Sequence, residues 1–148
     1  MKKVKSFDEF IKNGIVKKVA LDTNRLLNFV RKAERKYESI GERLNKLGIT
    51  KKNAEEYVES SYDIVMLLIR AKMLSEGYKA IGYGAHEAEV SFLGKLDFSE
   101  NEIQFADQLR YFRNGMLYYG TELDKEYAQK AIDFLNLVYP KLKKLVEK

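Results

Sequence analysis

The segment from residue 109 to residue 120, LRYFRNGMLYYG, holds the side chains with which this chain could grip a phosphate or a carboxylate. On a helix, residues three or four positions apart share a face, so Arg110, Asn114 and Tyr118 follow one another on a polar face. Arg113 lies at the border of this face and an apolar one. An arginine there can bury its stem and present its planar fork at the rim, which suits bidentate contact with an anion.

A structural role for Arg113 is the alternative. A half-buried arginine can satisfy carbonyl groups at a helix end, and here it could pair with Glu102. The residues that follow favour the anion site, because Tyr118 and Tyr119 add polar aromatic groups and Gly120 is typical of a helix end.

Residue types exclude several kinds of chemistry. The chain has no cysteine, and His86 is its only histidine. Thiolate zinc sites, disulfides, cysteine nucleophiles and histidine-based metal clusters are therefore excluded, and we expect no metal and no cofactor. The net charge of +5 is compatible with a polyanionic partner, although lysines on solvated helix faces explain most of it.

Size and composition predict one folded domain over residues 1–148. Hydrophobic residues make up 45% of the chain and charged residues 33%, as in ordinary globular helical proteins. No apolar run approaches the length of about 18 residues that a membrane helix needs. Asp8 and Glu9 stand where a signal peptide would have its apolar stretch, so we expect a cytoplasmic protein without a membrane segment.

Helix start and stop signals divide the chain into helices and short connections. They predict an all-α fold, an antiparallel up-and-down bundle of four to five helices with short extra helices. Strand-like alternation is not seen, so residues 15–21 are predicted to be a connector and residues 77–84 a turn. The predicted helices span residues 6–13, 22–48, 50–77, 85–95, 99–120 and 124 to the end.

The stretch Tyr62–Leu74 is apolar on almost every side, which is typical of a helix at the centre of a bundle. Asp63 and Arg70 interrupt it. Because buried charges need partners, we expect both to pair with neighbouring helices.

Three features in this order resemble the HEPN family, small helical bundles of prokaryotes that are often encoded beside a minimal nucleotidyltransferase. The first is the helix ending RAKMLSEG at residues 70–77, and the second is the glycine-rich turn that leads to His86. The third is Arg113-Asn114 followed by Tyr118-Tyr119-Gly120. The resemblance covers most of the chain from Tyr62 onward.

Many HEPN members resemble metal-independent ribonucleases with an arginine, a polar residue, a few variable positions and then a histidine. Arg113 and Asn114 match the first two positions, but Tyr118 and Tyr119 stand where the histidine should fall. Imidazole exchanges protons near neutral pH, whereas a tyrosine with a pKa of about 10 is a poor base. Tyrosine remains a hydrogen-bond donor and a stacking surface.

The resemblance therefore implies a homodimeric module that binds RNA or a nucleotide through Arg110, Arg113 and Tyr119. Its partner would be a nucleotidyltransferase in a toxin–antitoxin-like pair. Two alternatives stay open. One is a ribonuclease that uses Arg113 and Asn114 with Tyr118 or His86, and the other is a structural helical protein that serves oligomerisation.

Overall fold

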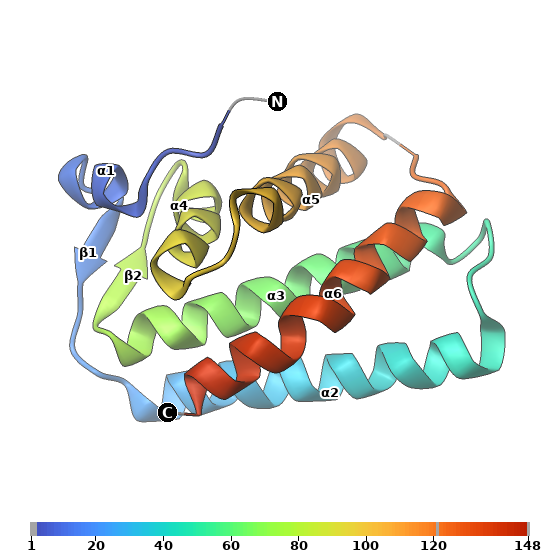
Figure 1. The fold of residues 1–148 in the computed structure, drawn as a ribbon, viewed down its shortest axis with the longest axis horizontal. Helices are drawn as coiled ribbons and strands as arrows, with labels where there is room; N and C mark the ends of the chain where they lie inside the picture. The colour runs from blue at the N-terminus through green and yellow to red at the C-terminus, as the bar shows by residue number, and fades with distance from the viewer. Residues whose placement is uncertain (1–2, 121, 148) are drawn as a thin grey trace.

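The computed structural model describes residues 3–120 and 122–147, without the side chains of residues 117 and 118. Four long helices alternate in direction, as Figure 1 shows for α2, α3, α5 and α6. This confirms the predicted all-α up-and-down bundle. The elements in chain order are α1 (Phe7–Lys12), β1 (Val16–Lys18), α2 (Thr23–Leu47), α3 (Ala54–Ser75), β2 (Tyr78–Ala80), α4 (Ala85–Ser91), the 3₁₀ helix η1 (Phe92–Leu96), α5 (Glu100–Tyr119) and α6 (Lys125–Val146).

Side-chain caps fix the starts of the long helices. Asp22 accepts a hydrogen bond from the Arg25 amide at 3.0 Å and so begins α2. Ser99 and Glu102 form a reciprocal capping box at the start of α5, because each side chain accepts a hydrogen bond from the other residue's amide. The Glu102 carboxylate therefore accepts a hydrogen bond from the Ser99 amide within its own helix start. The predicted starts at Asp22 and Ser99 are confirmed.

A short antiparallel ribbon of β1 and β2 corrects the prediction that the chain has no strand. Val16 pairs with Ala80 in its register. Three residues are too few to show an alternating pattern in sequence. Backbone hydrogen bonds from Val19 to Gly77 and from Ile81 to Ile15 extend the pairing, and the Tyr78 side chain packs against the core. The Tyr78 ring lies 5.2 Å from that of Phe7 and 6.4 Å from that of Phe92, measured between centroids.

Helix α3 starts later than predicted, at Ala54 rather than Thr50. The Thr50 amide donates to the Asn53 side chain at 2.7 Å, and the Asn53 amide donates back to the Thr50 hydroxyl at 3.2 Å. The Asn53 amide group also donates to the Gly48 carbonyl at 3.2 Å. These local bonds hold residues 50–53 in a turn that competes with helix formation.

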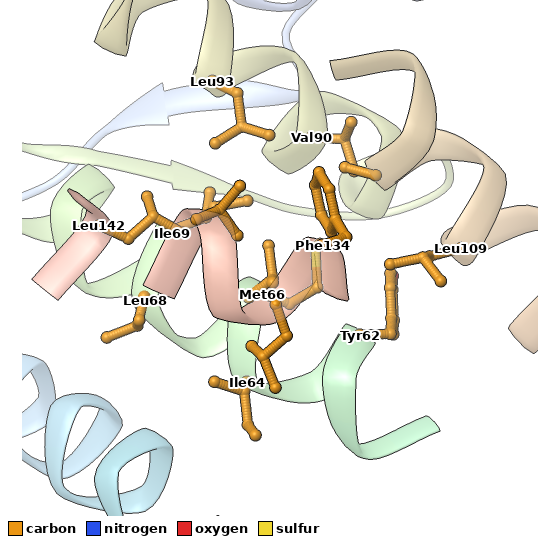
Figure 2. Packing of buried hydrophobic residues seen from close by; sticks show 14 of the residues in the cluster. Tyr62, Ile64, Met66, Leu68, Ile69, Val90, Leu93, Leu109, Phe134 and Leu142 are labelled. Carbon is orange, nitrogen blue, oxygen red and sulfur yellow. The ribbon is translucent and has the colours of Figure 1, made fainter. Parts of the chain in front are cut away.

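Helix α3 lies at the centre of the bundle, between α2 and α6 on one side and α4 and α5 on the other (Figure 1). Buried side chains cover almost its whole circumference, as predicted. Figure 2 shows Ile64, Met66 and Ile69 of this helix in one cluster with Phe134 and Leu142 of α6. Packing in this core fixes the rotation of α3 about its axis and therefore the directions in which Asp63 and Arg70 point.

Among the helices in the described part of the chain, none combines the length and the apolar character needed to cross a membrane.

Truncating a central leucine tests this packing. We expect Leu68→Ala, at a position with no exposed surface, to lower the free energy of unfolding by about 2–5 kcal/mol in urea denaturation. The matched control Leu137→Ala, at a position 65% exposed, is expected to change it by less than about 0.5 kcal/mol. Equal losses in the two variants would contradict a core centred on α3.

Candidate functional site

Arg113 reaches from α5 to α3. Its Nε lies 3.4 Å from an Asp63 carboxylate oxygen, and its guanidinium carbon lies 5.5 Å from the centroid of the Tyr62 ring. The Nε is buried and makes no hydrogen bond with a described residue, although 25% of the side chain is exposed. Arg113 thus pairs with Asp63 rather than Glu102, in a long contact that leaves N–H donors of the guanidinium unused.

Arg110 is held within its own helix. Its Nε donates to the Asp107 carboxylate at 2.7 Å, and Asp107 is buried. Burial alone would lower the pKa of Arg110, but the hydrogen bond and the charge of Asp107 outweigh it, so the pKa lies above the ordinary arginine value. Arg110 is therefore a fixed cation beside Arg113.

Arg70 of α3 is clamped to α4. Its Nε and one terminal nitrogen donate to the two oxygens of the buried Glu89 carboxylate at 2.7 and 3.2 Å. Burial opposes the charge on Arg70, but this bidentate hydrogen bond and the Glu89 charge raise its pKa overall. The expected pairing of Asp63 and Arg70 with neighbouring helices is confirmed, with Arg113 and Glu89 as the partners.

His86 stands beside this clamp at the start of α4. Its Nδ1 lies 2.9 Å from Glu89 and 3.3 Å from a terminal nitrogen of Arg70. Because a carboxylate only accepts hydrogen bonds, we assign the proton of neutral His86 to Nδ1, donated to Glu89. The Nε2 atom is then left with its lone pair, on a side chain that is 56% exposed.

Tyr62 is the residue around which the three arginines gather. Its side chain is buried in the core beside Leu109 (Figure 2). Burial is the main cause of a rise in the pKa of Tyr62 to about 12, and the negative charge of Glu89 adds to the rise. The positive charges of Arg70, Arg113 and Arg110 oppose it, which places all three within electrostatic range of the hydroxyl.

The contacts of Arg113 and His86 with α3 are separated along the helix. Arg113 contacts Asp63, whereas His86 and Glu89 gather at Arg70, seven residues further on. Seven residues of α-helix span about 10 Å, and no described contact joins Arg113 to His86. One chain therefore does not bring these two predicted catalytic residues into contact.

The remaining predicted residues differ in placement. Asn114 is half-buried on α5. Tyr119 is 85% exposed, so it is a surface residue and not part of the core. The Tyr118 side chain lies outside the described residues. Gly120, at a positive φ of 66°, ends α5 as predicted.

Two buried carboxylates of the site were not among the predicted residues. Glu89 stands three positions after His86, and Asp107 three positions before Arg110. Residues at this spacing are neighbours on a helix surface, so the signal was present in the sequence. Tyr62 carried no such signal, because an aromatic residue in an apolar stretch indicates only core packing.

Within residues 3–120 and 122–147, no group of three or more potential ligand side chains could hold a metal ion. The chemistry that the site supports is hydrogen bonding and charge pairing with an anion, together with proton exchange at His86 Nε2.

The raised pKa of Tyr62 makes the stability of the fold sensitive to alkali. The stabilising contribution of neutral Tyr62 is complete below about pH 10, where the unfolded chain also keeps its proton, and is lost as the pH rises toward about 12. Between about pH 8 and pH 11 we expect the wild type to lose about 1 kcal/mol more of its free energy of unfolding than Tyr62→Phe does. Urea denaturation at both pH values measures this, and equal losses would contradict the burial of the hydroxyl.

Comparison of the chain with protein-family models, with curated proteins and with solved structures finds no match. The resemblance to the HEPN family consequently stays a prediction that rests on the residues named above.

Proposed function

We propose that this protein is a HEPN-like module that binds phosphate groups of RNA or of a nucleotide at Arg113. In this proposal it acts in the cytoplasm as a homodimer, as the partner of a minimal nucleotidyltransferase in a toxin–antitoxin-like pair. The observation that carries the binding function is the incomplete pairing of Arg113, whose side chain is 25% exposed and whose Nε makes no hydrogen bond with a described residue.

The contrast with the other two arginines supports this choice. Arg70 and Arg110 each donate at 2.7 Å to a buried carboxylate, so displacing either partner would leave a buried charge. The Asp63 partner of Arg113 is 29% exposed and lies 3.4 Å away. An ion pair of this kind is worth little, so an incoming phosphate competes with it at small cost.

Exposed aromatic side chains on the same helix suit either of two roles in this function. Tyr111 is exposed on α5, and Tyr119 lies almost fully open near the end of the helix. Aromatic rings bind unpaired bases by stacking, and they are enriched at protein interfaces. Both uses agree with an RNA site built close to a dimer contact.

Removing the Arg113 charge tests the binding function. We expect Arg113→Gln to weaken binding of a fluorescein-labelled single-stranded RNA about tenfold, because a charge-assisted contact to phosphate is lost. Asp63→Asn is expected to strengthen binding roughly two- to fivefold, because it removes the competing carboxylate. Fluorescence anisotropy at several salt concentrations measures both effects, and the wild-type affinity should fall with salt.

The control for the lost charge is Arg35→Gln, on the exposed surface of α2. It changes the net charge by the same amount at a distance from α5. Absence of RNA binding by the wild type would exclude the function, as would equal losses in Arg113→Gln and Arg35→Gln.

A metal-independent ribonuclease is the second candidate, and one contact favours it. Glu89 orients His86 so that Nε2 faces away from the clamp as a proton acceptor. In such a reaction Nε2 takes the proton of a ribose 2′-hydroxyl, the 2′-oxygen attacks the phosphorus, and the 5′-oxygen leaves with a proton from a second group. Because Arg113 and His86 of one chain are not in contact, Arg113, Asn114 and Tyr118 of a second subunit would stabilise the phosphate and supply that proton.

Cleavage of labelled RNA in the presence of EDTA separates the two candidates. If the protein only binds RNA, we expect no cleavage by the wild type. Cleavage that is lost in His86→Ala and in Arg113→Gln, but kept in Arg35→Gln, would assign the ribonuclease activity instead.

A further inference from the structure

A pocket of about 320 Å³ lies on the far side of the Arg70–Glu89 clamp from Arg113, where α2, the end of α3, β2 and α4 meet. Its apolar lining includes Phe29, Met73 and Leu74, and the last two are buried core residues. The volume is at the lower end of the range for small-molecule sites, about 300–1,000 Å³. The pocket is therefore large enough for a single small organic molecule and too small for an oligonucleotide.

The charged groups of the pocket wall give it a positive balance. The cations Arg25, Arg70 and Lys79 line it together with a single carboxylate, that of Glu89. Glu89 is already engaged by Arg70 through two hydrogen bonds. Arg25 and Lys79 make no ion pair within the part of the chain that the structure describes, so their charges are available to a ligand.

Arg25 is the cation that the structure holds at the apolar wall. Its guanidinium carbon lies 5.7 Å from the centroid of the Phe29 ring, which also lines the pocket. Phe29 is one helical turn after Arg25 on α2, so its ring can make a cation–π contact with the Arg25 guanidinium group. An anionic head group bound by Arg25 would thus be joined to a body that lies against Phe29.

We propose that this pocket is a second binding site, specific for a small organic anion whose apolar body fills the space beside Phe29 and Met73 and whose head group pairs with Arg25. The clamp of Arg70 on Glu89 forms a fixed wall of the site, and Ala85 at the start of α4 leaves room for the ligand. This site uses neither Arg113 nor Asp63, so probe binding can be measured separately from RNA binding at Arg113. His86, the proton acceptor of the second candidate function, also lines the pocket.

A matched pair of probes tests the requirement for charge. The anion 8-anilinonaphthalene-1-sulfonate and the neutral N-phenyl-1-naphthylamine have the same aromatic body, and only the first has a sulfonate. Fluorescence titration of the full chain is expected to show saturable binding of one sulfonate probe per chain, about tenfold tighter than the neutral probe. Equal affinities for the two probes, or binding without saturation, would overturn the proposal.

Variants locate the binding site. We expect Arg25→Gln to weaken the sulfonate probe about tenfold and to leave the neutral probe unchanged. Ala85→Leu should abolish binding of both by filling the space. Arg35→Gln, on the same helix outside the pocket, and Arg113→Gln should bind both probes as the wild type does.

A measurement on the unaltered protein does not depend on the folding of any variant. In two-dimensional amide NMR spectra, the sulfonate probe is expected to shift the signals of residues 25–29, 73–80 and 85–89, which contribute to the pocket wall. Shifts confined to other segments would overturn the proposal. RNA binding lost in Arg113→Gln together with unchanged probe binding would show that the two sites are separate.

Discussion

The burial of α3 on nearly all sides is the constraint on which the rest of the structure depends. A helix in this position must have its apolar residues covered by several neighbours, and any charged residue on it must find a partner there. Helices α2 and α6 lie along one side of α3 (Figure 1), and their buried apolar residues belong to the same core cluster as those of α3. The charged residues Asp63 and Arg70 find their partners on α5 and α4, and these two ion pairs lie on the opposite side of α3 from α6.

On that side, the strength of each ion pair separates structural from functional groups. The buried carboxylates Glu89 and Asp107 hold Arg70 and Arg110 in short hydrogen bonds, which makes these arginines part of the scaffold. Arg113 has the same guanidinium group, but its partner Asp63 is partly exposed and lies at the longer distance of 3.4 Å. A guanidinium group whose Nε makes no hydrogen bond with a described residue is suited to anion recognition, and this is the basis of the proposed phosphate site.

The Arg70–Glu89 clamp separates two regions with different binding properties. On one side, Arg113 shares helix α5 with the exposed tyrosines Tyr111 and Tyr119, which suits an extended ligand with phosphates and bases. On the other side, the pocket combines apolar side chains such as Phe29 and Met73 with the cations Arg25 and Lys79, which suits a small amphipathic molecule. The Arg70–Glu89 pair lines the pocket, whereas Arg113 pairs with Asp63, so the pocket and the proposed phosphate site use different cations.

The sequence by itself determined the helices and their order, because caps such as Asp22 and Ser99 and the apolar spacing of each helix act through neighbouring residues. It also showed that Asp63 and Arg70 needed partners. Only the tertiary structure decided which residues these were, that β1 and β2 pair, and that a pocket forms at Arg25. Contacts between residues far apart in the chain leave no local pattern, since the bundle and not the spacing brings them together.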